Sequence, residues 1–162
     1  MDAHGVTPIL NVSDIAASFA WFALWGWKKM WDYGTPPTFG AVRSGKCNIF
    51  LCQGAQGGRG RGPNTTTFQV EGDEAGDKGV WMSVWVDDVD SVHKQCVAAS
   101  LEVTFSPHDM PWHVREMHVR HPDGHVFRLE PGPRPRELVA RHIAVTWPTT
   151  TTSNASSTRN SP

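Results

Sequence analysis

The sequence has few cysteines and no long apolar run. Its three cysteines, Cys47, Cys52 and Cys96, form no CxxC pair, and their number is odd. A disulfide framework is therefore not expected, and unpaired thiols favour a reducing, cytoplasmic location. No apolar stretch approaches the length of a membrane span, and no basic segment leads into an apolar run at the N-terminus. We therefore expect neither a transmembrane segment nor a signal peptide.

A surplus of charge is also missing. The 162 residues include 15 Lys and Arg against 16 Asp and Glu, which gives a formal net charge of −1. Nucleic-acid-binding domains normally carry a basic surplus, so we expect neither nucleic acid nor a membrane as partner. Apolar residues make up 39% of the chain, which suits a soluble globular domain with a sizeable core.

Tyrosine is nearly absent, with one residue, whereas there are eight tryptophans. Most of the tryptophans are expected in the core, because they are large and largely apolar. So many of them also make an aromatic wall around a ligand plausible.

The chain repeats itself at a spacing of 74 residues, so that 7–27 corresponds to 81–101. Each copy has an alternating strand pattern, a polar residue suited to a helix N-cap, and apolar residues at helical spacing. The candidate N-caps are Ser13 or Asp14 in the first copy and Asp87 or Asp88 in the second.

Three strand candidates follow each predicted helix. They lie at 27–33, 38–43 and 47–53 in the first copy, and at 102–106, 114–120 and 125–130 in the second. The turn "HPDG" (121–124) joins the last two as a hairpin, since Pro presets φ and Asp-Gly tolerates tight geometry. Each half thus reads β-α-β-β-β, which predicts an α+β fold of two tandem βαβββ modules that form cupped mixed sheets.

The predicted organisation is a first module at 1–53, a flexible glycine-rich inter-module loop at 54–79, a second module at 80–132 and a C-terminal extension at 133–162. The loop contains "GGRGRG", but a phosphate-binding loop would need a following helix, and two arginines are too few for an RNA-binding tail. From about Thr149 the sequence has almost no apolar residue, which predicts disorder.

The doubled module, with "V-x-D-[IV]" before each helix, resembles the vicinal oxygen chelate superfamily. That superfamily includes glyoxalase I, extradiol dioxygenases, fosfomycin-resistance thiol transferases and bleomycin-resistance proteins. The segments "MPWHVREMHVRHPDGHVFRLEPG" (110–132), "FLCQG" (50–54) and "WDYGTPPTFGAV" (31–42) look most like the bleomycin-resistance branch. The resemblance covers about residues 5–132 and implies the glyoxalase/bleomycin-resistance fold. His121 departs from the family, which usually has Asp there.

The resemblance also implies where a metal would bind. Metal-using members hold a divalent ion at four positions, which correspond here to Thr7, Trp81, Arg128 and a residue of the strand 47–53. None of them supplies a His or carboxylate ligand, and about three are needed. We therefore expect no metal, no other cofactor and no catalytic residue.

The alternative is a metal-dependent enzyme of the glyoxalase type, that is, a lyase, isomerase or thiol transferase with rearranged metal ligands. Its ligands would include Glu116, His118 and Glu130.

Three histidines, His118, His121 and His125, lie close together in the sequence and raise the question of a metal site. Alternate residues of a strand share a face. This places His118 on the cup side, His125 on the packed side and His121 in the turn. The three are therefore not expected to converge on one ion.

The same alternation predicts which residues line the cup. They form a mostly aromatic wall with a few polar groups, which is typical of a pocket for an organic ligand. Trp81 and Trp85 would stack on a flat heteroaromatic ring, and Glu116 or Glu130 would pair with a ligand cation. Alternatively, Arg128 forms a purely structural ion pair with one of these glutamates. The ligand-binding candidates are Trp81, Trp85, Glu116, His118, Arg128, Glu130, Phe50, Trp112 and Asn11.

These features, with the resemblance, predict a protein that binds and sequesters a bleomycin-type glycopeptide antibiotic and so confers resistance. A homodimer is expected, because members of this branch pair so that two grooves form at the subunit boundary. A fold relic with an unrelated small ligand or a regulatory role is a third possibility, since fold alone does not fix function.

Overall fold

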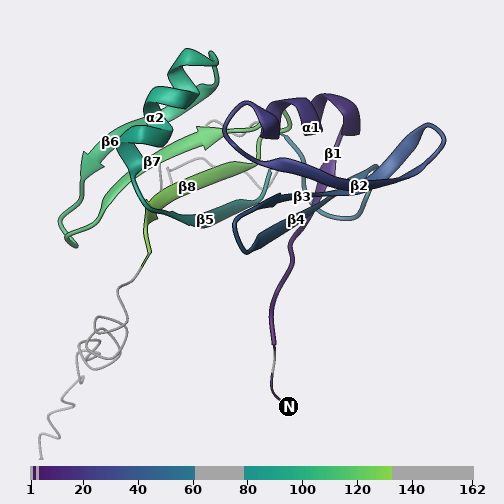
Figure 1. Ribbon diagram of the computed structural model, residues 1–162, viewed down its shortest axis with the longest axis horizontal. Coiled ribbons are helices and arrows are strands. Elements are labelled where there is room, and N and C mark those ends of the chain that lie inside the picture. The colour runs from purple at the N-terminus through teal and green to yellow at the C-terminus, as the bar shows by residue number, and fades with distance from the viewer. Residues whose placement is uncertain (1, 3, 61–78, 133–162) are drawn as a thin grey trace, which may run out of the picture. The chain divides into compact units, whose positions relative to one another are not determined.

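The computed structural model describes residues 2, 4–60 and 79–132, and these form the same β-α-β-β-β series twice (Figure 1). The first module comprises β1 (Ile9–Val12), α1 (Ile15–Ala23), β2 (Lys28–Gly34), β3 (Pro37–Ser44) and β4 (Cys47–Gln53). The second comprises β5 (Trp81–Val86), α2 (Val89–Ala98), β6 (Glu102–Asp109), β7 (Arg115–Arg120) and β8 (Val126–Pro131). The predicted fold class is confirmed.

Each module forms a four-stranded mixed sheet. The first sheet has the order β1-β4-β3-β2, and the second sheet has the equivalent order β5-β8-β7-β6. In each, the first and last strands of the module pair in parallel, and the remaining pairs are antiparallel. This equivalence is the structural counterpart of the 74-residue repeat.

The structure selects one N-cap from each predicted pair. The Asp14 carboxylate accepts a hydrogen bond from the Ala17 N–H at 2.9 Å, and Asp88 accepts from Asp90 and Ser91 at 2.9 and 3.1 Å. Side-chain acceptors at this position satisfy N–H groups that have no partner within the helix. The two helices therefore begin at equivalent points of the repeat.

One hydrophobic core joins α1 to both sheets. Trp21 and Trp25 lie with their ring centroids 5.7 and 5.4 Å from that of Phe127 on β8, although α1 belongs to the first module. Only part of the tryptophan set is in this core. Within the described residues, Trp21, Trp25 and Trp27 are buried, whereas Trp31, Trp81, Trp85 and Trp112 are exposed.

The ends of the inter-module loop contact the "HPDG" turn. The Gly60 N–H donates to the Asp123 carbonyl at 2.9 Å, and the Gly79 N–H donates to the Gly60 carbonyl at 3.1 Å. A Cβ on Gly79 would lie 2.2 Å from the carbonyl carbon of Gly124, so only glycine fits there. Residues 61–78 of the predicted loop, and the C-terminal extension with its predicted disorder, lie outside the described residues.

Candidate ligand-binding site

The second sheet has one face covered by α2 and one face turned away from it, which we call the second open face. Met117, Val119, Phe127 and Leu129 fill the covered side and are fully buried. By alternation and strand register, the other side carries most of the predicted ligand-binding residues. They are Trp81 and Trp85 on β5, Glu116 and His118 on β7, and Arg128 and Glu130 on β8.

Two tryptophans on the second open face are exposed to solvent. Trp81 and Trp85 lie on the same face of the edge strand β5, on either side of Ser83, and are 49% and 61% exposed. Tryptophan that is not buried in a core offers a large apolar plane to a flat ring. These two indoles are therefore the residues of the face that a ligand would reach first.

Arg128 lies between two carboxylates on the second open face. Its Nε donates to Glu116 Oε2 at 2.7 Å, and its Nη1 donates to Glu130 Oε1 at 3.2 Å. Glu116 is fully buried, and a buried carboxylate is stable only when it is paired. The alternative considered above, a structural ion pair between Arg128 and a neighbouring glutamate, is therefore present. Glu130 keeps 13% side-chain exposure and is the carboxylate that a ligand cation would meet.

His118 is enclosed rather than open to a ligand. It is fully buried, its Nε2 lies 3.6 Å from Glu116 Oε1, and its ring centroid lies 5.1 Å from that of Phe105. The Trp81 ring stands edge-on to it, with the centroids 6.3 Å apart. His118 therefore supports one of the exposed indoles from within the sheet.

The remaining predicted residues lie elsewhere. Phe50 and Asn11 are on the first sheet, and Trp112 is in the turn between β6 and β7. Sequence analysis missed that the Phe50 ring contacts Trp31 and Phe39, at centroid distances of 5.4 and 5.7 Å. Applying the same alternation to the predicted strands 27–33 and 38–43 would have identified Trp31 and Phe39 as neighbours on this face.

The metal positions implied by the resemblance do not fit a divalent ion. Trp81 and Arg128 occupy two of them, and the Arg128 guanidinium is fixed there by two carboxylates. In the part of the chain that the structure describes, no three His, Cys, Asp or Glu side chains are grouped so as to hold a metal.

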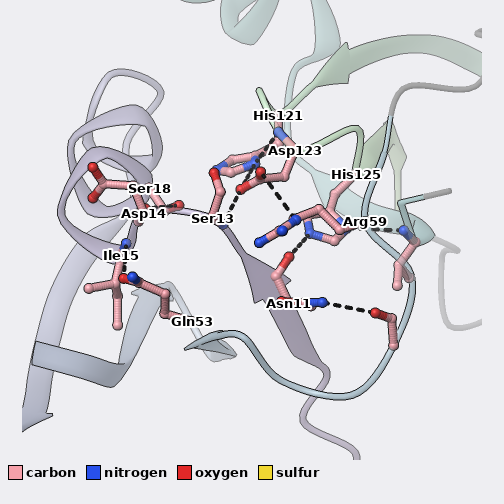
Figure 2. A network of polar contacts seen from close by, with 12 residues as sticks. Asn11, Ser13, Asp14, Ile15, Ser18, Gln53, Arg59, His121, Asp123 and His125 are labelled. Carbon is pink, nitrogen blue, oxygen red and sulfur yellow. Dashed lines mark hydrogen bonds and ion pairs between the residues drawn. The ribbon is translucent and has the colours of Figure 1, made fainter. Parts of the chain in front are cut away.

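Two of the three neighbouring histidines contact the first module instead. The His121 ring packs against Trp21 with the centroids 4.8 Å apart, and His125 bonds to β1 (Figure 2). His125 Nε2 lies 2.8 Å from the Asn11 carbonyl of β1, and His125 Nδ1 accepts from the Val80 N–H at 3.0 Å. The Asp123 carboxylate accepts from the Ser13 N–H at 2.9 Å. The turn of the second module therefore holds the end of β1 through hydrogen bonds.

Burial fixes the charge state of these histidines. It lowers the pKa of His121 to about 4, with a further lowering by His125, and it also lowers the pKa of His125. Because His125 Nδ1 accepts from a backbone N–H, its ring is neutral and Nε2 is the donor to Asn11. Both rings are therefore uncharged at neutral pH and serve as structural hydrogen-bonding groups.

Comparisons with known proteins agree with this architecture. The sequence model of the Glyoxalase/Bleomycin resistance protein/Dioxygenase superfamily matches residues 4–129. No curated protein is significantly similar to the chain in sequence. Among the described residues, no helix is long and apolar enough to cross a membrane.

Solved structures share the fold at low sequence identity. TioX from Micromonospora sp. ML1 is 18% identical, with a TM-score of 0.62 over 80% of this chain and 98% of that one. A bleomycin resistance determinant encoded on the transposon Tn5 is 14% identical, with a TM-score of 0.59 over 82% and 100% of the two chains. A bleomycin-binding protein complexed with bleomycin is 15% identical, with a TM-score of 0.56 over 80% and 99%.

Proposed function

Because the chain belongs to the Glyoxalase/Bleomycin resistance protein/Dioxygenase superfamily, we propose that it binds and sequesters a bleomycin-type glycopeptide antibiotic. The motifs of the bleomycin-resistance branch support this choice within the superfamily. Two of the structures that share the fold are named for bleomycin resistance or bleomycin binding. Binding in stoichiometric amounts lowers the free drug concentration, so the proposal needs no chemical step.

The observation that carries the proposal is the pair of exposed tryptophans beside a partly exposed carboxylate. Trp81 and Trp85 offer two ring planes on one strand, and Trp85 lies opposite Glu130 in the register of β5 and β8. A flat heteroaromatic group would stack on the indoles, and a nearby ligand cation would interact with the rings and with Glu130. This combination matches a drug that carries both groups.

The proposal includes a homodimer that acts in the cytoplasm. All three cysteines are unpaired, which suits a reducing compartment. A closed two-fold dimer is the commonest assembly of soluble homo-oligomers, and it would bring the open sheets of two subunits together. Sedimentation velocity should show a dimer at micromolar concentration, and a monomer throughout the concentration range would contradict this part of the proposal.

Isothermal titration of bleomycin into three variants tests the site. Trp85→Ala should weaken binding by about 1–3 kcal/mol, as loss of a stacking partner does. Glu130→Gln should weaken binding more at low salt than at high salt, because ions in solution screen a partly exposed charge. Val97→Ala, which trims an exposed apolar residue on α2, should leave the affinity unchanged. Equal affinities for Trp85→Ala and the native protein would refute the proposed site.

The drug itself distinguishes sequestration from the enzymatic alternative. Mass spectrometry of bleomycin recovered after incubation should show an unchanged mass. A modified drug, or a stoichiometric transition metal that is lost in Glu130→Ala, would favour a metal-dependent enzyme of the glyoxalase type instead.

A further inference from the structure

The start of β5 is tied to the "HPDG" turn through Val80, the residue before Trp81. The Val80 N–H donates to His125 Nδ1 at 3.0 Å, and the Val80 carbonyl accepts from the Val126 N–H at 2.9 Å. The preceding residue, Gly79, packs so closely on the turn that a Cβ there would lie 2.4 Å from the backbone nitrogen of His125. The His125 side chain is therefore part of the anchor for this strand end.

Trp81 depends on this anchor because of its place in the sheet. It is the first residue of β5, an edge strand that pairs with β8 alone. Its side chain is 49% exposed, and its ring meets His118 only edge-on, with the centroids 6.3 Å apart. Strand ends held by few hydrogen bonds open locally. The bond from Val80 to His125 therefore helps to fix where the Trp81 ring stands.

Protonation of His125 would break one of its two hydrogen bonds and keep the other. In the neutral ring, Nδ1 accepts from Val80, and Nε2 donates to the Asn11 carbonyl at 2.8 Å (Figure 2). A second proton would occupy Nδ1, so that two donors would face each other and the bond to Val80 would be lost. The Nε2 donor is the same in both states. Acid would thus release the start of β5 without detaching the turn from β1.

We propose that His125 is a positioning residue for Trp81: its neutral ring fixes the start of β5, and its protonation in mild acid releases that strand end and weakens ligand binding on the second open face. The inference rests on the proposed function, because it takes Trp81 as a ligand contact. The release itself is a property of the ligand-free protein and is measured without a drug.

Three charged or titratable side chains among the described residues face His125, and they set the pH of release. They are Asp123 and His121 of its own turn and Arg59 of the inter-module loop, whereas β1 and β5 present backbone groups. Burial lowers the pKa of His125 below the ordinary 6.5; the hydrogen bond to Asn11 and the charge of Asp123 oppose this, and the charge of Arg59 adds to it. Burial also lowers the pKa of His121 to about 4, so that ring stays uncharged in mild acid.

NMR of the ligand-free full chain tests the anchor directly. The His125 ring signal gives the pH at which the ring gains its proton, and the exchange rate of the Val80 amide, corrected for the intrinsic effect of pH, gives the release. Protection of Val80 should fall at least about fivefold across the His125 titration, as the loss of one hydrogen bond implies.

Two histidine variants provide the comparison. His125→Asn places an oxygen near the Nδ1 position and cannot gain charge, so the protection of Val80 should stay constant over the same pH range. His4→Asn, which removes an exposed histidine, should behave as the native protein does.

Two charge variants separate a switch from a merely structural contact. Arg59→Gln should move the midpoint of release to higher pH, because it removes a positive charge that disfavours the protonated ring. Asp123→Asn should move it to lower pH, because it removes a negative charge that favours this state. In each variant the Val80 amide should follow the His125 ring. Protection of Val80 that does not change as the ring titrates, or a midpoint of release that neither variant moves, would overturn the inference.

Bleomycin titrations connect the anchor to the ligand site. The affinity of the native protein should fall about fivefold from pH 7 to the pH of release, through weakened stacking on Trp81. His125→Asn should lose less, and its residual loss reports the drug's own titration. An equal loss in both proteins would show that His125 does not position Trp81 for the ligand. If bleomycin does not bind at pH 7, the proposed function fails, and the exchange of the Val80 amide still decides whether His125 releases β5.

Discussion

His125 uses both of its ring nitrogens in hydrogen bonds, one of which joins the two modules. Nε2 donates to the Asn11 carbonyl at 2.8 Å, and Nδ1 accepts from the Val80 N–H at 3.0 Å. His125→Ala would remove the partner of both backbone groups, which are partly buried, and would leave a cavity where the fully buried imidazole was. Each buried polar group left unsatisfied costs about 1–3 kcal/mol. We expect the free energy of unfolding to fall by about 2–4 kcal/mol in urea titrations, whereas the exposed control His4→Ala should have no effect.

The lowered pKa values of His121 and His125 predict sensitivity to acid. Burial lowers the pKa of His121 from the ordinary 6.5 to about 4, so the folded protein binds fewer protons than the unfolded chain between these pH values. The stability contributed by the neutral ring is complete above pH 6.5 and is lost as the pH falls towards 4. The loss from His121 amounts to about 3 kcal/mol, at about 1.4 kcal/mol per pKa unit.

Urea titrations at pH 7, 5.5 and 4.5 measure this loss. His121→Asn keeps an acceptor for the Asp123 N–H but cannot become charged, so its stability should fall less over the same range. An identical pH dependence in this variant and the native protein would show that other groups cause the acid sensitivity.

Alternation predicted the face of each site residue but not its exposure. Glu116 and His118 are on the expected side of the second sheet, yet both are fully buried. Their burial depends on how Arg128 reaches across to Glu116 and on how Phe105 and Trp81 pack around His118. Such contacts involve several strands and their bulges, and no pattern within a single strand encodes them.

At the scale of elements, the N-caps of the two helices are equivalent and should contribute equally. Asp14→Ala and Asp88→Ala each remove a carboxylate that accepts from the first turn. Each substitution should lower the free energy of unfolding by about 1 kcal/mol in urea titrations. The neighbouring Asp87 is exposed and is not a cap, so Asp87→Ala should change it by less than about 0.5 kcal/mol. Equal effects of Asp87→Ala and Asp88→Ala would contradict the assignment.

The elements themselves could be predicted closely because their signals are local. Predicted strands at 47–53 and 114–120 correspond to β4 and to β7 at Arg115–Arg120. The end of α1 is harder to predict. Glycine commonly follows a helix end directly, but this helix ends at Ala23 with Leu24 as its C-cap, and Gly26 lies two residues further on with a φ of 97°. The bend after the helix brings Trp25 and Trp27 into the core, which is a tertiary effect.

For the whole molecule, the two modules share a core but differ in the chemistry of their open faces. The open face of the first sheet carries the rings of Trp31, Phe39 and Phe50 near Lys28 and Arg43. The second open face combines exposed tryptophans with a glutamate–arginine cluster. The repeat in the sequence predicted two equivalent folds, since burial requires the same apolar pattern in each. The open faces are not constrained by that core, so their side chains differ between the modules.

Calorimetric titration of the native full chain with copper-free bleomycin is the decisive test of drug sequestration. Binding should be saturable at about micromolar affinity or tighter, and the melting temperature should rise, because a ligand that binds only the folded state stabilises it. The absence of both heat and a melting shift at concentrations far above micromolar would contradict sequestration of this drug.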